Sequence, residues 1–194
     1  MAYVDRNTYA ENQSKLKLSN EKFKEIKDLF EFNKSELSFY KKQKGKIKAY
    51  LKEGDLQPAV VCLLHPLLIG AYSDEMDAVV MLKFPTSFIN KYKLEEGQRL
   101  VTSNVYWPKD MFSIAEDIFV GEEYGGTYRD VIPIVSLFLT DKKNEEYVKS
   151  LTNIFDEDTW EKVVKKSNEY IKENPYLHRN GFFYLLFNNK KEFK

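Results

Sequence analysis

The sequence predicts an α/β (α+β) fold, with a mixed central sheet of about five or six strands packed against helices. Three observations support this fold class. Helical periodicity runs from residue 23 to residue 51, short apolar segments rich in Val and Leu recur from residue 58 onward, and helical periodicity returns between residues 144 and 173. Because hairpin and helix-linked connections are both expected between the strands, we also expect a mixed strand order.

The N-terminal helical arm comes first. Residues 19–21 (Ser-Asn-Glu) form a typical helix start, since serine caps free N–H groups and an acidic first turn suits the helix dipole. Apolar residues then recur at helical spacing as far as Leu51, with an interruption near Asn33. This pattern predicts two helices, or one kinked helix, ending at Gly54.

Four strands are expected next. Three short segments at 59–64, 67–72 and 78–84 are rich in Val and Leu and are bounded by Pro, Gly and Asp. Their nearly continuous apolar character indicates burial on both faces of the sheet. The acidic segment 74–77 would close a hairpin between the second and third strands, and 99–107 has the composition of a fourth strand.

A short helix is expected to start at 85–87 (Pro-Thr-Ser) and to run through Lys93, between the third and fourth strands. Apolar residues at i, i+3 and i+4 spacing predict another helix over 111–120. The glycine-containing segment 121–130 is then expected to form a loop, and the apolar run 131–140 to form a buried strand.

The remaining expected elements are two capped helices and a final strand, at 144–155, 159–173 and 181–187. The chain has no internal repeat and no long linker. We therefore expect a single domain over residues 1–194, made of a basic helical arm (1–55) and an α/β core (56–194).

Cysteine content and apolar runs restrict the class of protein. A single cysteine, Cys62, excludes an internal disulfide and a multi-cysteine metal site, and its apolar neighbours favour a packing role. The N-terminus lacks an apolar run of signal-peptide length, and no run of about 18 uncharged apolar residues follows. We expect a cytoplasmic bacterial protein with no membrane partner.

The charges are unevenly distributed in a chain of zero net charge. Residues 1–53 carry 13 Lys and Arg against 8 Asp and Glu, whereas residues 54–140 carry 6 against 12. A basic arm beside an acidic centre could steer a charged partner toward the protein, or the two parts could attract one another.

The acidic turn Asp74-Glu75-Met76-Asp77 is the first candidate site. Carboxylates at the ends of buried strands can hold Mg²⁺ or act as acid and base, but hairpin turns also favour Asp for backbone reasons alone. A metal site would need further carboxylates, and five are available: Asp110, Asp117, Glu122, Glu123 and Asp130. The plain turn is the favoured interpretation.

Two histidines form the second candidate. His65 lies between apolar runs and His178 lies in a polar loop beside Arg179, and the two are 113 positions apart in no recognised motif. A satisfied or solvated role is therefore favoured for each of them over a metal or acid–base centre.

The glycine loop 121–126 has the wrong character for a phosphate cradle, because it contains two glutamates and precedes a strand. A recognition loop that exposes Tyr124, Tyr128 and Arg129 fits its composition better. The six lysines between Lys41 and Lys52 could bind a nucleic-acid backbone, but the near-neutral isoelectric point favours a solvated helix face.

These observations favour a non-enzymatic protein-binding module over an enzyme, with no cofactor and no resident metal. One concrete form is an immunity or inhibitor protein that docks an acidic surface on the basic cleft of a toxin. The expected binding residues are Asp74, Glu75, Asp77, Trp107, Glu122, Glu123, Tyr124, Tyr128 and Arg129. The alternatives are a metal-dependent hydrolase that uses strand-end carboxylates with His65, and a nucleic-acid binder that uses Lys41–Lys52.

Overall fold

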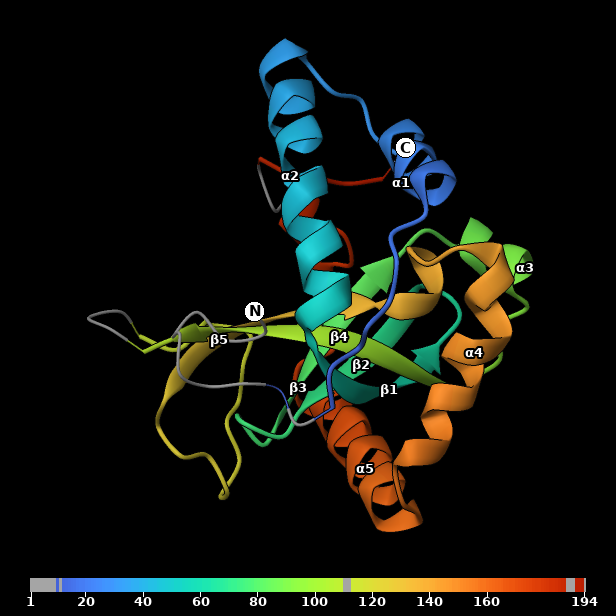
Figure 1. The fold of residues 1–194 in the computed structure, drawn as a ribbon. Coiled ribbons are helices and arrows are strands. Elements are labelled where there is room, and N and C mark those ends of the chain that lie inside the picture. The colour runs from blue at the N-terminus through green and yellow to red at the C-terminus, as the bar shows by residue number, and fades with distance from the viewer. Residues whose placement is uncertain (1–9, 11, 110–112, 188–190, 194) are drawn as a thin grey trace.

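The computed structural model describes residues 10, 12–109, 113–187 and 191–193. A curled six-stranded sheet in the order β5-β4-β1-β2-β3-β6 lies at its centre (Figure 1). The strands are β1 (Asp55–Leu63), β2 (Leu67–Ser73), β3 (Ala78–Phe84), β4 (Arg99–Pro108), β5 (Tyr128–Val135) and β6 (Arg179–Asn180). All neighbouring strands are antiparallel except β3 and β6, which are parallel. The mixed sheet and the α+β class are confirmed.

The central strands are buried on both faces, as their apolar runs predict. Helix α5 (Glu157–Glu173) packs on one face, where Val163 shares a buried cluster with alternate strand residues such as Leu68 and Met81. The intervening residues, including Ile69 and Val80, face the larger core on the other side of the sheet. The period of two along each strand therefore sorts the side chains into two cores.

The larger core is closed by the remaining helices and by the segment 182–186. These helices are α1 (Asn20–Asp28), α2 (Lys34–Glu53), α3 (Ser87–Tyr92) and α4 (Glu145–Ser150). The break between α1 and α2 confirms the two-helix alternative. The Asn33 side chain caps α2, and the Glu36 side chain accepts a hydrogen bond from the Asn33 backbone N–H, which forms a capping box.

The helix predicted at 111–120 is wrong over residues 113–120, which form turns and irregular structure; residues 111 and 112 lie outside the described residues. Tertiary contacts override the helical spacing here. The Ala115 N–H donates to the Arg129 carbonyl at 2.9 Å beside the edge strand β5, and Asp117 is bound by an arginine from β6.

Three other predicted elements also differ in extent from the observed ones. The strand expected to reach residue 140 ends at Val135, because 136–138 form a 3₁₀ turn in which Ser136 accepts two backbone hydrogen bonds. The expected final strand at 181–187 is replaced by the short β6 and a 3₁₀ turn at 183–185. The helix expected at 144–155 is α4 followed by a 3₁₀ turn at 151–154.

Candidate functional site

The structure brings the two acidic segments of the sequence together at one end of the sheet. The β2–β3 turn (74–77) touches the loop that precedes β5, because the Gly121 N–H donates to the Met76 carbonyl at 3.3 Å. Both segments can be followed at the same end of the sheet in Figure 1. We call Asp74, Glu75, Glu122 and Glu123 the acidic end.

Asp77 joins the two segments and is itself buried. Its Oδ1 accepts a hydrogen bond from Tyr72 at 3.0 Å and pairs with Lys162 at 3.0 Å and Lys166 at 3.2 Å, both from α5. Its Oδ2 accepts from the Glu123 N–H at 3.4 Å. Burial acts to raise the pKa of Asp77, but the hydrogen bonds from Lys162, Lys166 and Tyr72 outweigh it and hold the pKa below its ordinary value. Asp77 is therefore an anchor within the fold.

Glycine is required where the loop crosses Asp77. A Cβ built on Gly121 would lie 1.9 Å from Asp77 Oδ2 and 2.6 Å from the Asp77 carbonyl oxygen, closer than real Cβ contacts allow. Lys162 also pairs with Glu123, so Lys162 and Lys166 balance the carboxylates of Asp77 and Glu123 at this junction. We call these four charged residues the Asp77 cluster.

A further carboxylate, Asp55, lies beneath the acidic end. The Tyr106 hydroxyl is 3.1 Å from Asp74 Oδ1 and 3.4 Å from Asp55 Oδ2, and Gln57 donates to Asp55 at 2.7 Å. Burial, followed by the charge of Asp74, raises the pKa of Asp55 to about 7. The only role that the sequence pattern indicates for Asp55 is to help end the helical arm.

The aromatic residues expected at the binding surface differ in their exposure to solvent. Trp107 on β4 is 39% exposed and Tyr124 is half-buried. The expected exposure of Tyr128 is wrong: its ring is 3% exposed and packs against Tyr106, with ring centroids 5.2 Å apart. Arg129 is half-buried. Trp107 and Tyr124 are therefore the rings of this set that remain accessible at the base of the loop.

The strand-end carboxylates do not meet His65. His65 lies in the β1–β2 turn and the acidic turn lies at the other end of β2, about 20 Å away for a strand of this length. Within the described ranges, no three metal-ligating side chains gather at one place; Asp110 lies outside them. All six lysines between Lys41 and Lys52 are exposed on α2.

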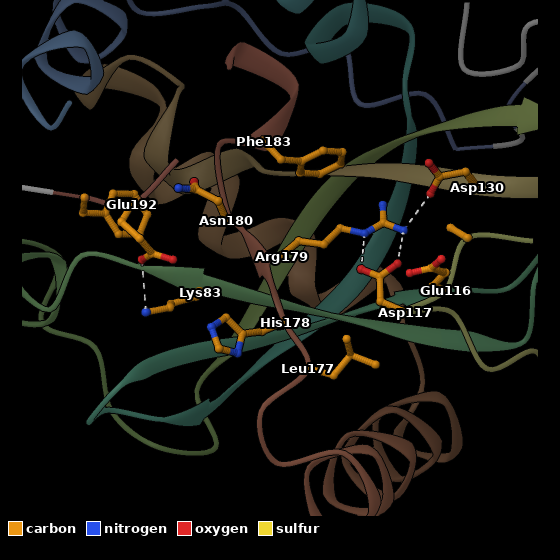
Figure 2. Close-up of a pocket in the computed structure, with 12 residues that line it drawn as sticks. Lys83, Glu116, Asp117, Asp130, Leu177, His178, Arg179, Asn180, Phe183 and Glu192 are labelled. Atoms are coloured by element: carbon orange, nitrogen blue, oxygen red, sulfur yellow. Dashed lines mark hydrogen bonds and ion pairs between the residues drawn. The ribbon is translucent and has the colours of Figure 1, made fainter. Parts of the chain in front are cut away.

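A cavity of about 580 Å³ borders the N-terminal part of the loop between β4 and β5 (Figure 2). Its walls come from residues 115–117 of that loop, from Lys83 on β3, from β6 and from residues 192–193. It is lined by charged, polar and apolar side chains, which include Glu116, Asp117, Asp130, Leu177, His178, Arg179, Phe183 and Phe193.

Arg179 forms the inner wall of this cavity and lies between two aspartates (Figure 2). Its guanidinium makes a two-point pair with Asp117, in which Nη2 is 2.6 Å from Oδ1 and Nε binds Oδ2. Nη2 also lies 2.8 Å from Asp130 Oδ1, and Nη1 donates to the Val131 carbonyl at 3.0 Å. Because Arg179 belongs to β6 and Val131 to β5, the contact links the two outer strands of the curled sheet.

The carboxylates outnumber the guanidinium in this group, which we call the Arg179 cluster (Asp117, Asp130 and Arg179). Burial raises the pKa of Asp130 above its ordinary value, although the charge of Arg179 opposes the rise. Burial, followed by the charge of Lys83, lowers the pKa of His178. With both aspartates ionised, the Arg179 cluster carries one more negative charge than positive charge.

The signal that could identify Arg179 from the sequence is compositional. It is one of four arginines in a chain rich in lysine, and arginine is preferred where two carboxylate oxygens must be held at once. The sequence suggests Asp117 and Asp130 only as spare metal ligands, a role that their contacts with Arg179 do not support.

Comparison with known proteins finds no matching family model, no matching curated protein and no matching solved structure. The residues of the acidic end and of the cavity are therefore the features that bear on function. Among the described residues, no helix is both long and apolar enough to cross a lipid bilayer.

Proposed function

We propose that the chain is a non-enzymatic, cytoplasmic protein-binding module that docks its acidic end on a positively charged surface of another protein. The observation that carries the proposal is the junction of two acidic segments, 74–77 and 121–124, through Asp77. An acidic patch assembled from distant parts of the chain raises the rate at which a basic partner is captured and orients it on arrival.

The members of the acidic end contribute differently to its charge. Glu123 is paired with Lys162, and Asp74 shares a hydrogen bond with Tyr106. Glu122 is exposed at the tip of the junction. We therefore expect Glu122 to make the largest single electrostatic contribution to docking.

Trp107 and Tyr124 are the proposed apolar anchors. Trp107 pairs with Asp130 across β4 and β5, and the next residue on β4 pairs with Tyr128. The Tyr124 hydroxyl donates to the Tyr128 carbonyl, which places both rings near the base of the same loop. Tryptophan and tyrosine bordered by charged groups are the residue types that most often dominate binding energy at protein interfaces.

In its most specific form, the proposal is an immunity or inhibitor protein. A nuclease-type toxin presents a basic cleft to its polyanionic substrate. An acidic surface with aromatic anchors could occupy that cleft in place of the substrate. The acidic end has the charge that this role requires.

A charge reversal tests the proposal. Glu122→Lys should remove the native partner from a pull-down out of the producing cell's extract, whereas Glu31→Lys, the same change in the α1–α2 connection, should retain it. Both positions are exposed, so both variants should melt as the wild type does. A partner captured equally by the two variants would exclude the acidic end as the docking surface.

A further inference from the structure

The cavity beside Arg179 has the dimensions of a small-molecule site. Its volume of about 580 Å³ falls within the range of about 300–1,000 Å³ that is typical of ligand pockets. Its lining combines charged groups with the rings of Phe183 and Phe193 and the side chain of Leu177. Phe183 and Leu177 lie on opposite sides of Arg179 (Figure 2). This mixture of polar and apolar walls suits a ligand that has a charged head and an apolar body.

The charge of the cavity walls determines whether a cationic or an anionic head group is attracted. Among the described lining residues, the permanent cations are Lys83 and Arg179, and they face four carboxylates: Glu116, Asp117, Asp130 and Glu192. The His178 imidazole has a lowered pKa and adds no full positive charge at neutral pH. The walls are therefore net negative, and an incoming cation would be attracted.

The cations already present are committed to other groups. Arg179 is 11% exposed, and it is bound by two carboxylates and by the Val131 carbonyl. Lys83 lies 3.3 Å from Glu192. An anionic ligand would have to compete with these pairs, whereas a cation would meet the exposed Glu116 and would share Asp130 with Arg179.

The apolar wall can also favour a cation. The Arg179 guanidinium carbon lies 5.1 Å from the centre of the Phe183 ring, so this ring already accepts one planar cation. Phe193 and Leu177 add apolar surface against which the body of a ligand could be removed from water.

We propose that this cavity binds an organic cation, an ammonium or guanidinium group carried on a short apolar body. The charged head lies against Glu116 and Asp130, where it balances the excess negative charge of the Arg179 cluster. The body lies against the Phe183 ring, and Phe193 and Leu177 contribute further apolar surface to the lining. Binding of the cation does not depend on the docking function proposed for the acidic end.

Titration of the full chain, followed by two-dimensional NMR, tests the proposal with four probes. Phenylethylammonium and n-butylguanidinium should give saturable shifts centred on residues 115–117 and 177–183. The neutral 2-phenylethanol and the anionic 3-phenylpropionate should bind at least tenfold more weakly. Equal binding of the anion, or shifts centred elsewhere, would overturn the proposal.

Glu116→Gln is the decisive variant because Glu116 is exposed and its replacement should leave the fold intact. It should weaken binding of both cations at least threefold. Glu161→Gln, the same change at an exposed site on α5, should leave binding unchanged. Unaltered cation binding in Glu116→Gln would contradict the assignment of the head to this wall.

The guanidinium group could come from a free molecule or from an arginine side chain of a docked protein. Comparing n-butylguanidinium with the blocked peptide acetyl-Gly-Arg-Gly-amide distinguishes the two sources. Tighter binding of the free guanidine identifies a small-molecule site, and tighter binding of the peptide identifies a pocket for a partner's side chain. Failure of both, together with the ammonium probe, would refute the cation site. Neither result depends on Glu122.

Discussion

Two charge clusters anchor opposite ends of the same loop, and they differ in their balance of positive and negative groups. In the Asp77 cluster, two lysines of α5 face Asp77 and Glu123. In the Arg179 cluster, a single guanidinium faces two aspartates. The first is neutral within itself, and the second keeps an excess negative charge beside a cavity. A balanced cluster suits an anchor of the fold, whereas an unbalanced one suits a site that awaits a counter-charge.

The strongest test of this comparison removes Arg179. Arg179→Ala would leave two largely buried carboxylates without their cation, and we expect it to lower the free energy of unfolding by about 3 kcal/mol. Chemical denaturation at pH 7 measures the loss. The control is Arg99→Ala, which removes an exposed pair with Glu157 and a contact of the guanidinium over the Trp160 ring, and should lower the free energy of unfolding far less than Arg179→Ala does. Equal losses in the two variants would mean that the Arg179 cluster is no more than a surface ion pair.

A glycine replacement tests the Asp77 cluster by steric means. Gly121→Ala places a methyl group against Asp77 and should cost about 2 kcal/mol of stability, because the loop or the carboxylate must move. Gly125→Ala is the matched control, since a Cβ at that position would have no described heavy atom within 4 Å beyond its chain neighbours. Thermal unfolding compares the pair. A neutral Gly121→Ala would show that the loop is not held closely to Asp77.

The pH dependence of two neutral substitutions should have opposite signs. The folded-state pKa of Asp77 is lowered, so the stability it contributes is full above its unfolded pKa and is lost as the pH falls through the lowered value. The folded-state pKa of Asp130 is raised, so its contribution declines as the pH rises from the unfolded pKa through the raised value.

Relative to wild type, Asp77→Asn should therefore lose most stability near neutral pH and little in strong acid. The free energy of unfolding of Asp130→Asn, relative to that of the wild type, should increase as the pH rises. Urea unfolding at a series of pH values between about 3 and 8 measures both differences. If the two stability differences changed with pH in the same direction, the contrast between the balanced Asp77 cluster and the unbalanced Arg179 cluster would be wrong.

The smallest expected effect is on ligand binding. Acidification protonates Asp130, whose pKa is raised, and His178, whose pKa is lowered, and each protonation makes the cavity less negative. The other charged groups at the walls are Lys83, Glu116, Asp117, Arg179 and Glu192. Affinity for phenylethylammonium, measured by calorimetry at a series of pH values, should fall as the pH is lowered and these two groups become protonated. A constant affinity would show that protonation of Asp130 and His178 does not affect binding of the cation.

The sheet could be predicted from the sequence more fully than either charge cluster. Strands β1 to β3 have nearly continuous apolar sequences, and the expected segments lie within the observed ones except at the end of β1. The segment 113–120 has a helical pattern, but its polar contacts reach residues far along the chain. Local spacing records which residues share a helix face, and it contains no information on a pair such as Asp117 with Arg179, 62 positions apart.

The acidic end could be predicted in composition but not in arrangement. Asp74 and Glu122 can be selected by their charge, whereas the burial of Asp77 between the two segments depends on how the loop crosses the turn. Asp55 gives no signal in the sequence, because a carboxylate beside a helix end has an ordinary explanation. Its raised pKa arises from burial and from the approach of Asp74 through the fold.

The two anchors of the loop have an entropic consequence. Asp117 is fixed by Arg179, and the Glu123 backbone is fixed by Asp77, so the short stretch between them is tethered at both ends. The conformational entropy that a free loop would lose on meeting a partner has then already been lost during folding. A surface prepared in this way can bind tightly with a modest contact area, and loosening either tether should weaken binding even though no contact residue has changed.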